Sequence, residues 1–288
     1  MKRITPSIKI LAAITLVVGL LSQSTAQAQQ VQVTVTNNAP ANGIALTPFW
    51  FGFHGGSFDT FNGGSAVTAG LESLAEDGAV ATLSSEFNTA VAGGIDSTVT
   101  GAPNIPFPGP AGPRPILGGE STSAVFNIGG NNFLSYASMV LISNDFFVAN
   151  DNALDISSVL AGAGPITINV GTVYDAGTEF NDFATSAANG APFFGFGGGQ
   201  TGPNQSGPVD ENGVVTVVPG TGNPFAGFAN SALLGPNGVP TTFDFNDTSQ
   251  YTNGIATITI SAVAVPEPGS LTLLAAFAGC GVLRRRRK

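Results

Sequence analysis

Short runs in which apolar and polar residues alternate recur along this chain of 288 residues. In the first, Val31, Val33 and Val35 are separated by polar residues, which is the period-two pattern of a half-buried β-strand. The other runs are Ala124–Ile128, Phe133–Ile142, Ile166–Val170, Val214–Val218 and Ile255–Val265. Turns rich in Gly and Asn separate some of them, as in hairpins. Charged residues are few, while Gly, Ala, Ser, Thr and Asn are plentiful, so the sequence predicts an all-β domain with long turns rather than a helical bundle.

One stretch follows a helical period instead. Between Ser65 and Asp77, apolar residues recur at i, i+4, i+7 and i+8, and Gly78 follows as a stop signal. We therefore expect one short helix, placed over an edge of this domain. Its acidic residues Glu72, Glu76 and Asp77 are predicted to form a solvated face.

Two long segments, Asn88–Gly119 and Pro192–Pro224, carry many Gly and Pro residues. Both are predicted to be surface loops. The second contains the run Phe193–Phe196. We expect these rings to fix the loop to the core, an exposed adhesive patch being the alternative.

The N-terminus has the parts of a secretory signal peptide. Basic residues precede the apolar run Ile10–Leu21, and Ala26-Gln27-Ala28 provides an A-x-A cleavage site. Residues 1–28 are therefore predicted to be removed, so that the mature chain begins at Gln29. The body that remains, residues 29–264, is long enough to form one domain with its own core.

The charge of this body is one-sided. Among its residues there is one Arg, Arg114, and no Lys, against seventeen acidic residues, which gives a formal charge of −16 with His neutral. Such a field repels nucleic acid and anionic membrane surfaces, so neither is an expected partner of the body. It favours cations, because carboxylates without basic counter-ions need solvent, salt or bound metal to offset their repulsion.

Cysteine and histidine limit the chemistry further. The only cysteine, Cys280, lies outside the body, so thiol catalysis and Cys-ligated zinc are not expected there. His54 is the only histidine, and no G-x-S-x-G elbow accompanies it. We expect this histidine to be buried and hydrogen-bonded, a ligand-facing turn being the alternative. The body is therefore not predicted to be an enzyme.

The C-terminus, residues 265–288, has three parts. Val265–Ser270 carries a Pro-Glu-Pro box, Leu271–Leu283 is an apolar run, and Arg284–Lys288 is a basic cluster. The apolar run of thirteen residues would rise about 20 Å as an α-helix, which is short of a typical bilayer core. The basic cluster would hold its end on the cytoplasmic side of a membrane.

These three parts together resemble the PEP-CTERM sorting signal of Gram-negative bacteria that produce exopolysaccharide, an ordinary membrane anchor being the alternative. The resemblance implies export through the inner membrane, membrane contact through the C-terminal segment, and processing by an exosortase. The mature protein would then reach the cell surface or the extracellular matrix.

Three stretches of the body, in order, resemble the N-terminal domain of spondins. They are Phe51–Asp59 running into the "GL..LAE.G" helix at Val67–Gly78, Ala137–Val148 with its similarity to a "PSPDWFVG" strand end, and Tyr174–Glu179, which is close to "YDAGTD". The resemblance spans roughly residues 31–265. It implies a C2-like antiparallel β-sandwich.

In animal members of that family, the second and third stretches supply a calcium site. The resemblance assigns ligand roles to Asp145, Asp175 and Glu179, with Glu179 standing where the family has Asp. Calcium prefers several hard oxygen ligands in flexible geometry, and Gly177 would let the backbone bend so that these acids converge. The alternative is that the acids only cap turns after strands, as Asx turns do.

Together these features predict an exported, exosortase-processed protein of the cell surface or extracellular matrix. It would act in adhesion or in organising exopolysaccharide, with an extracellular polysaccharide or a surface protein as its partner and calcium ordering its loops. Two alternatives remain open. One is a secreted hydrolase acting on envelope polysaccharide, and the other is a structural envelope protein without a ligand.

Overall fold

The computed structural model describes residues 29–41, 43–103, 113–141, 143, 145–179, 213–218 and 254–263, and the backbone of two strands at 231–234 and 240–243. Residues 30–263 form one compact unit. The predicted signal peptide, the Phe193–Phe196 run and the sorting segment at 265–288 lie outside the described residues. Within the described ranges, no helix is long and apolar enough to span a membrane.

A four-stranded sheet forms one layer of this unit. Its strand order is β5 (Ser121–Asn127), β1 (Gln30–Asn37), β14 (Ala256–Ala262) and β9 (Ile166–Val170), and all neighbours are antiparallel. In β1, Val31, Val33 and Val35 are fully buried, whereas Gln32 between them is exposed. The period-two pattern therefore places one side of the sheet in the core and the other toward solvent, as predicted.

The second layer is an eight-stranded sheet. Its main order is β11 (Thr216–Val217), β10 (Tyr174–Asp175), β7 (Phe146–Ala149), β6 (Phe133–Leu141), β3 (Phe49–His54) and β4 (Ile95–Val99). Two short strands, β2 (Ala45–Leu46) and β8 (Leu154–Asp155), also pair with β6. A separate hairpin consists of β12 (Ser231–Leu234) and β13 (Pro240–Phe243).

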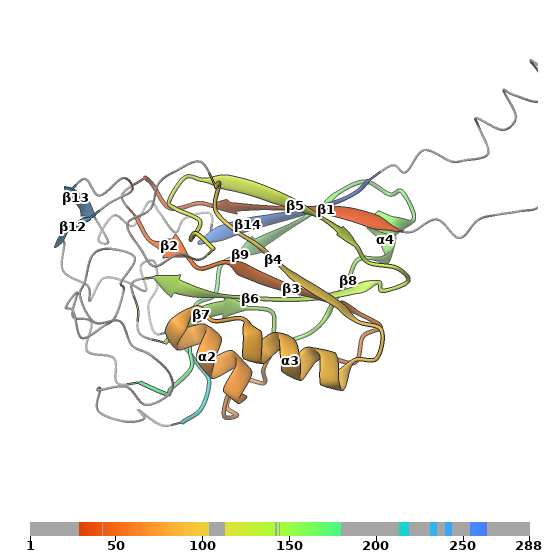
Figure 1. The fold of residues 1–288 in the computed structure, drawn as a ribbon, viewed down its shortest axis with the longest axis horizontal. Coiled ribbons are helices and arrows are strands. Elements are labelled where there is room, and N and C mark those ends of the chain that lie inside the picture. The colour runs from red at the N-terminus through yellow and green to blue at the C-terminus, as the bar shows by residue number, and fades with distance from the viewer. Residues whose placement is uncertain are drawn as a thin grey trace, which may run out of the picture. The chain divides into compact units, whose positions relative to one another are not determined.

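The two sheets pack face to face on the main core, so the predicted antiparallel sandwich is confirmed (Figure 1). The smaller sheet contributes Val33, Ile258 and Ile260, and the larger sheet contributes Phe49 and Phe51 among others. The rings of Phe49 and Phe51 stack with their centroids 5.9 Å apart. Each fully buried side chain of this size contributes about 1.5–3 kcal/mol to folding through the apolar surface it removes from water.

Two helices, α2 (Ala69–Asp77) and α3 (Ala81–Ala90), cover the other face of the larger sheet (Figure 1). They form a second core with the larger sheet, which includes Leu74 of α2, Phe87 of α3 and Trp50 of β3. The Phe87 ring meets the Trp50 ring edge-on, with centroids 5.3 Å apart. β3 is therefore buried on both faces, because its alternate residues point into different cores.

Helix α2 begins and ends at the residues that the sequence indicates. The Thr68 hydroxyl accepts the Leu71 N–H at 3.2 Å, which satisfies one of the free N–H groups of the first turn. Gly78 ends the helix with φ of 66°, a left-handed conformation that favours glycine. The stop signal at Gly78 is thereby confirmed.

The structure corrects three expectations about the fold. The described residues contain three helices instead of one, since α3 follows α2 and α4 (Ser157–Leu160) forms a single turn. Moreover, α2 and α3 lie on a sheet face rather than an edge. The predicted loop Asn88–Gly119 also contains β4, which pairs with β3. Polar contacts stabilise this region, because Asp96 of β4 accepts the Trp50 indole N–H at 3.1 Å.

The chain enters and leaves the sandwich at the same end. β1 and β14 are antiparallel neighbours, and the Val263 N–H donates to the Gln30 carbonyl at 2.9 Å. Asn127 of β5 pairs with Gln30, so β6, which follows after a short turn, starts at this end and runs away from it. The turn between β6 and β7 therefore lies at the opposite end (Figure 1).

Candidate cation site

Asp145 lies in the turn between β6 and β7, and its side chain is fully buried. Its Oδ2 accepts the backbone N–H groups of Thr178 and Glu179, both at 3.1 Å, and the Thr178 hydroxyl at 3.4 Å. Its Oδ1 is buried and has no hydrogen-bond partner. A buried carboxylate oxygen without a partner is costly, and an ion that satisfies it is one of the ordinary explanations.

The other two predicted acids lie on the segment that packs against Asp145. Asp175 of β10 pairs with Phe146, the residue that follows Asp145. Its Oδ1 accepts the Gly177 N–H at 2.7 Å, and Gly177 has φ of 68°, so an Asx turn bends the chain here. Glu179 is 2 % exposed. The structure thus brings the three acids together, and the turn-capping role considered for them is also present at Asp175.

A fourth carboxylate, Glu76 of α2, joins this group, so the predicted solvated helix face is wrong at this residue. Its side chain is 4 % exposed, and its Oε1 is buried without a hydrogen-bond partner. A side-chain hydrogen bond with Thr178, which Oε1 does not make, and the charge of Glu179 both act on this carboxyl group. The segment after β10 contributes to this environment, which helical spacing cannot reveal. We refer to Glu76, Asp145, Asp175 and Glu179 as the carboxylate cluster.

Burial shifts the proton equilibria of two members of the cluster. Desolvation raises the pKa of Glu76 to about 7, and the negative charges of Glu72 and Glu179 add to this. Desolvation also raises the pKa of Asp145 far above its usual range, with a further contribution from the charge of Asp175. The backbone N–H groups that donate to Asp145 oppose this rise. Ionising the cluster near neutral pH is therefore unfavourable unless a cation compensates the charge.

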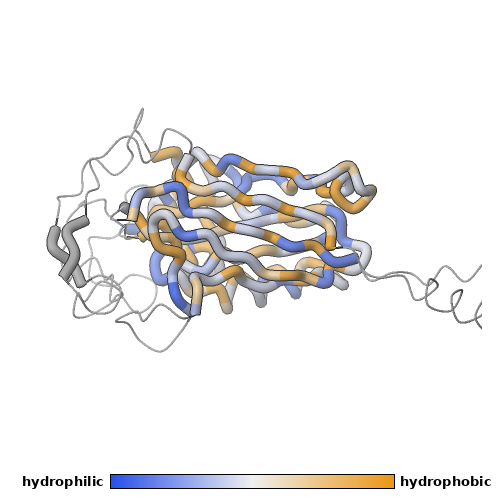
Figure 2. Tube along the Cα trace, turned by 90° about the horizontal axis from the view of Figure 1, so that it is seen from above, coloured by the Kyte–Doolittle hydropathy of each residue, from blue (hydrophilic) through white to orange (hydrophobic). Residues whose placement is uncertain are grey.

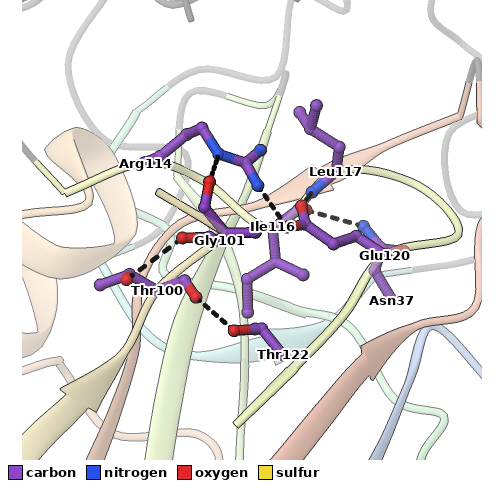
Figure 3. A network of polar contacts seen from close by, with 9 residues as sticks. Asn37, Thr100, Gly101, Arg114, Ile116, Leu117, Glu120 and Thr122 are labelled. Atoms are coloured by element: carbon purple, nitrogen blue, oxygen red, sulfur yellow. Dashed lines mark hydrogen bonds and ion pairs between the residues drawn. The ribbon is translucent and has the colours of Figure 1, made fainter. Parts of the chain in front are cut away.

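The single Arg of the body is engaged elsewhere. Arg114 forms an ion pair with Glu120 (Figure 3), and its Nε donates to the Ala102 carbonyl at 2.8 Å. Glu120 also accepts the Leu117 N–H at 3.0 Å, so the pair ties together both ends of the segment between β4 and β5. Because residues 29–264 contain no other Lys or Arg, no other such side chain of the body can neutralise the cluster.

The carboxylate oxygens are ligands of the kind that a hard cation prefers, but they do not surround a single position. Among the residues that the structure describes, no group of three or more His, Cys, Asp or Glu side chains is arranged so that it could hold a metal ion. The cluster offers two buried oxygens without hydrogen-bond partners, one on Asp145 and one on Glu76. Binding a cation would require the neighbouring side chains to turn toward these atoms.

His54 is buried and hydrogen-bonded, as predicted. Its Nδ1 accepts the Gly56 N–H at 3.0 Å, so in the neutral ring the proton lies on Nε2, which donates to the Ser135 hydroxyl at 3.1 Å. Ser135 in turn donates to the Phe58 carbonyl at 3.1 Å. Burial lowers the pKa of His54, which keeps the ring neutral. Both ring nitrogens thus serve the local structure.

Comparison with known families concerns the C-terminus. The model of the PEP-CTERM protein-sorting motif matches residues 264–288. A comparison with curated proteins gives no match. The chain therefore carries the predicted signal for export and for recognition by an exosortase, directed toward the cell surface in Gram-negative bacteria. The match does not reach the sandwich, so its resemblance to spondin N-terminal domains stays a prediction.

Proposed function

We propose that this protein is a non-catalytic component of the cell surface or extracellular matrix, and that its sandwich binds calcium at the carboxylate cluster. It would act in adhesion or in organising extracellular polysaccharide. The sorting motif supports the destination. The observation that carries the calcium proposal is the buried pair of Asp145 and Asp175, whose side chains interact closely while no donor group satisfies the Asp145 Oδ1 atom.

At neutral pH calcium would have to displace a proton from Asp145, because burial raises the pKa of this carboxyl to about 8. Calcium takes six to eight oxygen ligands from carboxylates, backbone carbonyls and water in flexible geometry, and the turn after β10 carries such groups. The Asp145 Oδ2 atom already orders the backbone of Thr178 and Glu179. A cation held by Oδ1 would therefore fasten the β6–β7 turn to the segment after β10, which is how binding would order the loops at this end.

The burial of the same acids argues against the hydrolase alternative. A glycosidase needs two carboxyl groups flanking a sugar bond in an open cleft. Asp145 is fully buried, and Glu76, Asp175 and Glu179 are between 2 % and 4 % exposed. A single ion can enter such a place through small side-chain movements, whereas a polysaccharide chain cannot.

Thermal unfolding of the mature protein with and without calcium tests the proposal. A ligand that binds only the folded state at a hundredfold excess over its Kd adds about 2.7 kcal/mol of stability, so Tm should rise by several degrees. Asp145→Asn keeps the shape of the side chain but removes its charge, and it should abolish most of this rise. The matched control is Asp151→Asn, which alters an exposed acid outside the cluster.

The control variant should keep the full calcium response. The proposal is wrong if millimolar calcium leaves the Tm of the unmodified protein unchanged, or if Asp145→Asn responds to calcium as strongly as the unmodified protein does. Either result would leave the sorting signal untouched and would favour a structural envelope protein without a ligand.

A further inference from the structure

The outer face of the four-stranded sheet carries no charge. Strands β5, β1, β14 and β9 contain no Asp, Glu, Lys, Arg or His, although the body as a whole has seventeen acidic residues. Glu120, which directly precedes β5, is held in its ion pair with Arg114. This sheet is therefore an uncharged surface on a strongly anionic domain.

Hydroxyl and amide side chains form an ordered array on this face. The strand register places one row side by side across all four strands, Ser123, Thr34, Thr259 and Thr167, and the next row is Ser121, Thr36, Thr257 and Asn169. We call these two rows the hydroxyl face. Neighbouring strands lie about 4.8 Å apart and alternate residues of one strand lie roughly 6.8 Å apart, so the polar groups form a regular grid.

The core fixes which way these side chains point. Val33 and Val35 of β1 and Ile258 and Ile260 of β14 are fully buried against the larger sheet. The residues between them in sequence must then lie on the solvent side. Figure 2 views the molecule from above, relative to Figure 1, and shows the alternation of hydrophobic and more hydrophilic residues along the strands.

Cross-strand hydrogen bonds orient part of the array. The Thr36 hydroxyl donates to the Ser121 hydroxyl at 2.9 Å, and the Gln32 side-chain amide donates to the Ser123 hydroxyl at 3.2 Å. The Asn38 amide donates to the Thr257 hydroxyl at 3.0 Å. A surface whose polar groups are already ordered loses less side-chain entropy when a partner binds.

We propose that the hydroxyl face is a docking surface for an uncharged polysaccharide. The grid presents hydroxyl donors and acceptors, which are the groups that recognise the hydroxyls of a neutral glycan, and the face carries no charge whose desolvation would oppose contact. The inference rests on the proposed function, because it takes the mature protein to lie in a matrix that contains polysaccharide.

Charge and composition disfavour other occupants. An anionic polymer would be repelled by a body with a formal charge of −16, and a cationic partner would be drawn to acids that lie elsewhere. A second copy of this chain would need apolar area to bury. On these four strands, Val125 is the one large hydrophobic residue that is exposed, at 56 %.

Affinity electrophoresis of the mature protein in native gels tests this docking surface. The gels contain hydroxyethylcellulose, dextran or galactomannan as neutral probes, or alginate as an anionic probe. We expect retardation by at least one neutral glycan and none by alginate. Thr34→Val/Thr259→Val removes two central hydroxyls while keeping side-chain shape and strand propensity, and it should weaken binding at least about tenfold.

Two further variants separate recognition from folding. Ser123→Ala/Thr167→Ala alters exposed positions in the same row and should weaken binding in the same direction. The matched control, Thr89→Val/Thr98→Val, makes the first chemical change on α3 and β4 and should bind normally. Thermal unfolding confirms that each variant is folded.

The docking proposal is overturned if no neutral glycan retards the protein, if alginate retards it equally, or if both row variants bind as the unmodified protein does. It is also overturned if sedimentation shows a dimer that the row variants dissociate, because the face would then join two copies. If the protein still fractionates with the cell surface or matrix in any of these cases, the proposed destination stands and only the docking surface is wrong.

Discussion

At the scale of single residues, Glu76 distinguishes this domain from what its sequence pattern suggests. Its pKa is raised to about 7 by burial, so between pH 4.5 and about 7 the folded state holds a proton that the unfolded state has lost. In calcium-free buffer the free energy of unfolding should therefore fall as pH rises through this window, by up to about 1.4 kcal/mol per pH unit for one group.

Glu76→Gln should reduce this dependence, because glutamine keeps the shape of the side chain and cannot ionise, while Asp145, whose pKa is raised to about 8, retains a slope of the same sign. The measurement is urea unfolding between pH 5 and pH 8 in the presence of a chelator. Glu72→Gln makes the same change one turn earlier in α2 and should keep most of the slope. A Glu76→Gln protein with the same pH slope as the unmodified protein would show that this carboxyl is not buried as described.

Three members of the carboxylate cluster could be predicted from the sequence, whereas the fourth, Glu76, could not, and the reason is physical. The resemblance to spondin N-terminal domains points to Asp145, Asp175 and Glu179, and the pairing of β7 with β10 places their segments next to one another. Glu76 was assigned to solvent because it flanks the apolar residues of α2 rather than lying among them. Its hydrogen bond to Thr178 joins residues far apart in sequence, and no local pattern encodes such a contact.

At the scale of elements, the Arg114–Glu120 pair is a nearly buried polar contact that holds the described parts of the segment between β4 and β5 (Figure 3). Its two side chains are 7 % and 11 % exposed, and the pair also engages the Ala102 carbonyl. Glu120→Ala would leave a buried guanidinium without its counter-ion. We expect a loss of about 3–5 kcal/mol in the free energy of unfolding, measured with urea.

Arg114→Met/Glu120→Leu is the informative companion variant. It removes both charges and retains apolar volume, so it should recover the part of the loss that comes from the unpaired charge. Glu120 also accepts backbone N–H groups, such as that of Leu117. These groups would stay unpaired in the double variant, so the recovery of stability would be incomplete. If Glu120→Ala changes stability by less than about 0.5 kcal/mol, the pair is not the stabilising contact that its burial indicates.

The helices and strands differ in how well they can be predicted from a single sequence. β1, β5, β9 and β14 are predictable because apolar and polar residues alternate along them, whereas β6 is predictable as a longer apolar-rich run and is buried on both faces. Helix α3 buries only Leu83 and Phe87, too few apolar residues to stand out. β4 was read as loop because its neighbourhood is rich in Gly, and part of its support comes from the Asp96 side chain rather than from apolar periodicity.

At the scale of the whole molecule, the two ends of the sandwich have different roles. The chain enters at β1 and leaves from β14 at one end, and the carboxylate cluster lies at the other. The predicted signal-peptide cleavage before Gln29 and the processing near the Pro-Glu-Pro box would both fall outside the compact unit of residues 30–263. Neither cleavage would remove a residue of the cluster or of the hydroxyl face.

Processing also changes the charge of the molecule. The full chain has a formal net charge of −9, because eight of its nine Lys and Arg residues lie in the two terminal segments. Removing these two segments, and Glu267 with the second, leaves the body with a formal charge of −16. The acidic domain that reaches the surface would therefore be better suited to hold cations than its precursor is.

Intact mass spectrometry of the native protein, purified separately from cells and from medium, tests the central claim most directly. We predict a mature form whose chain begins at Gln29 and ends close to Pro266–Pro268, having lost both the signal peptide and the basic cluster. A mature protein whose mass still includes Arg284–Lys288 would contradict the account, because the C-terminal segment would then be a retained anchor and not a processed sorting signal.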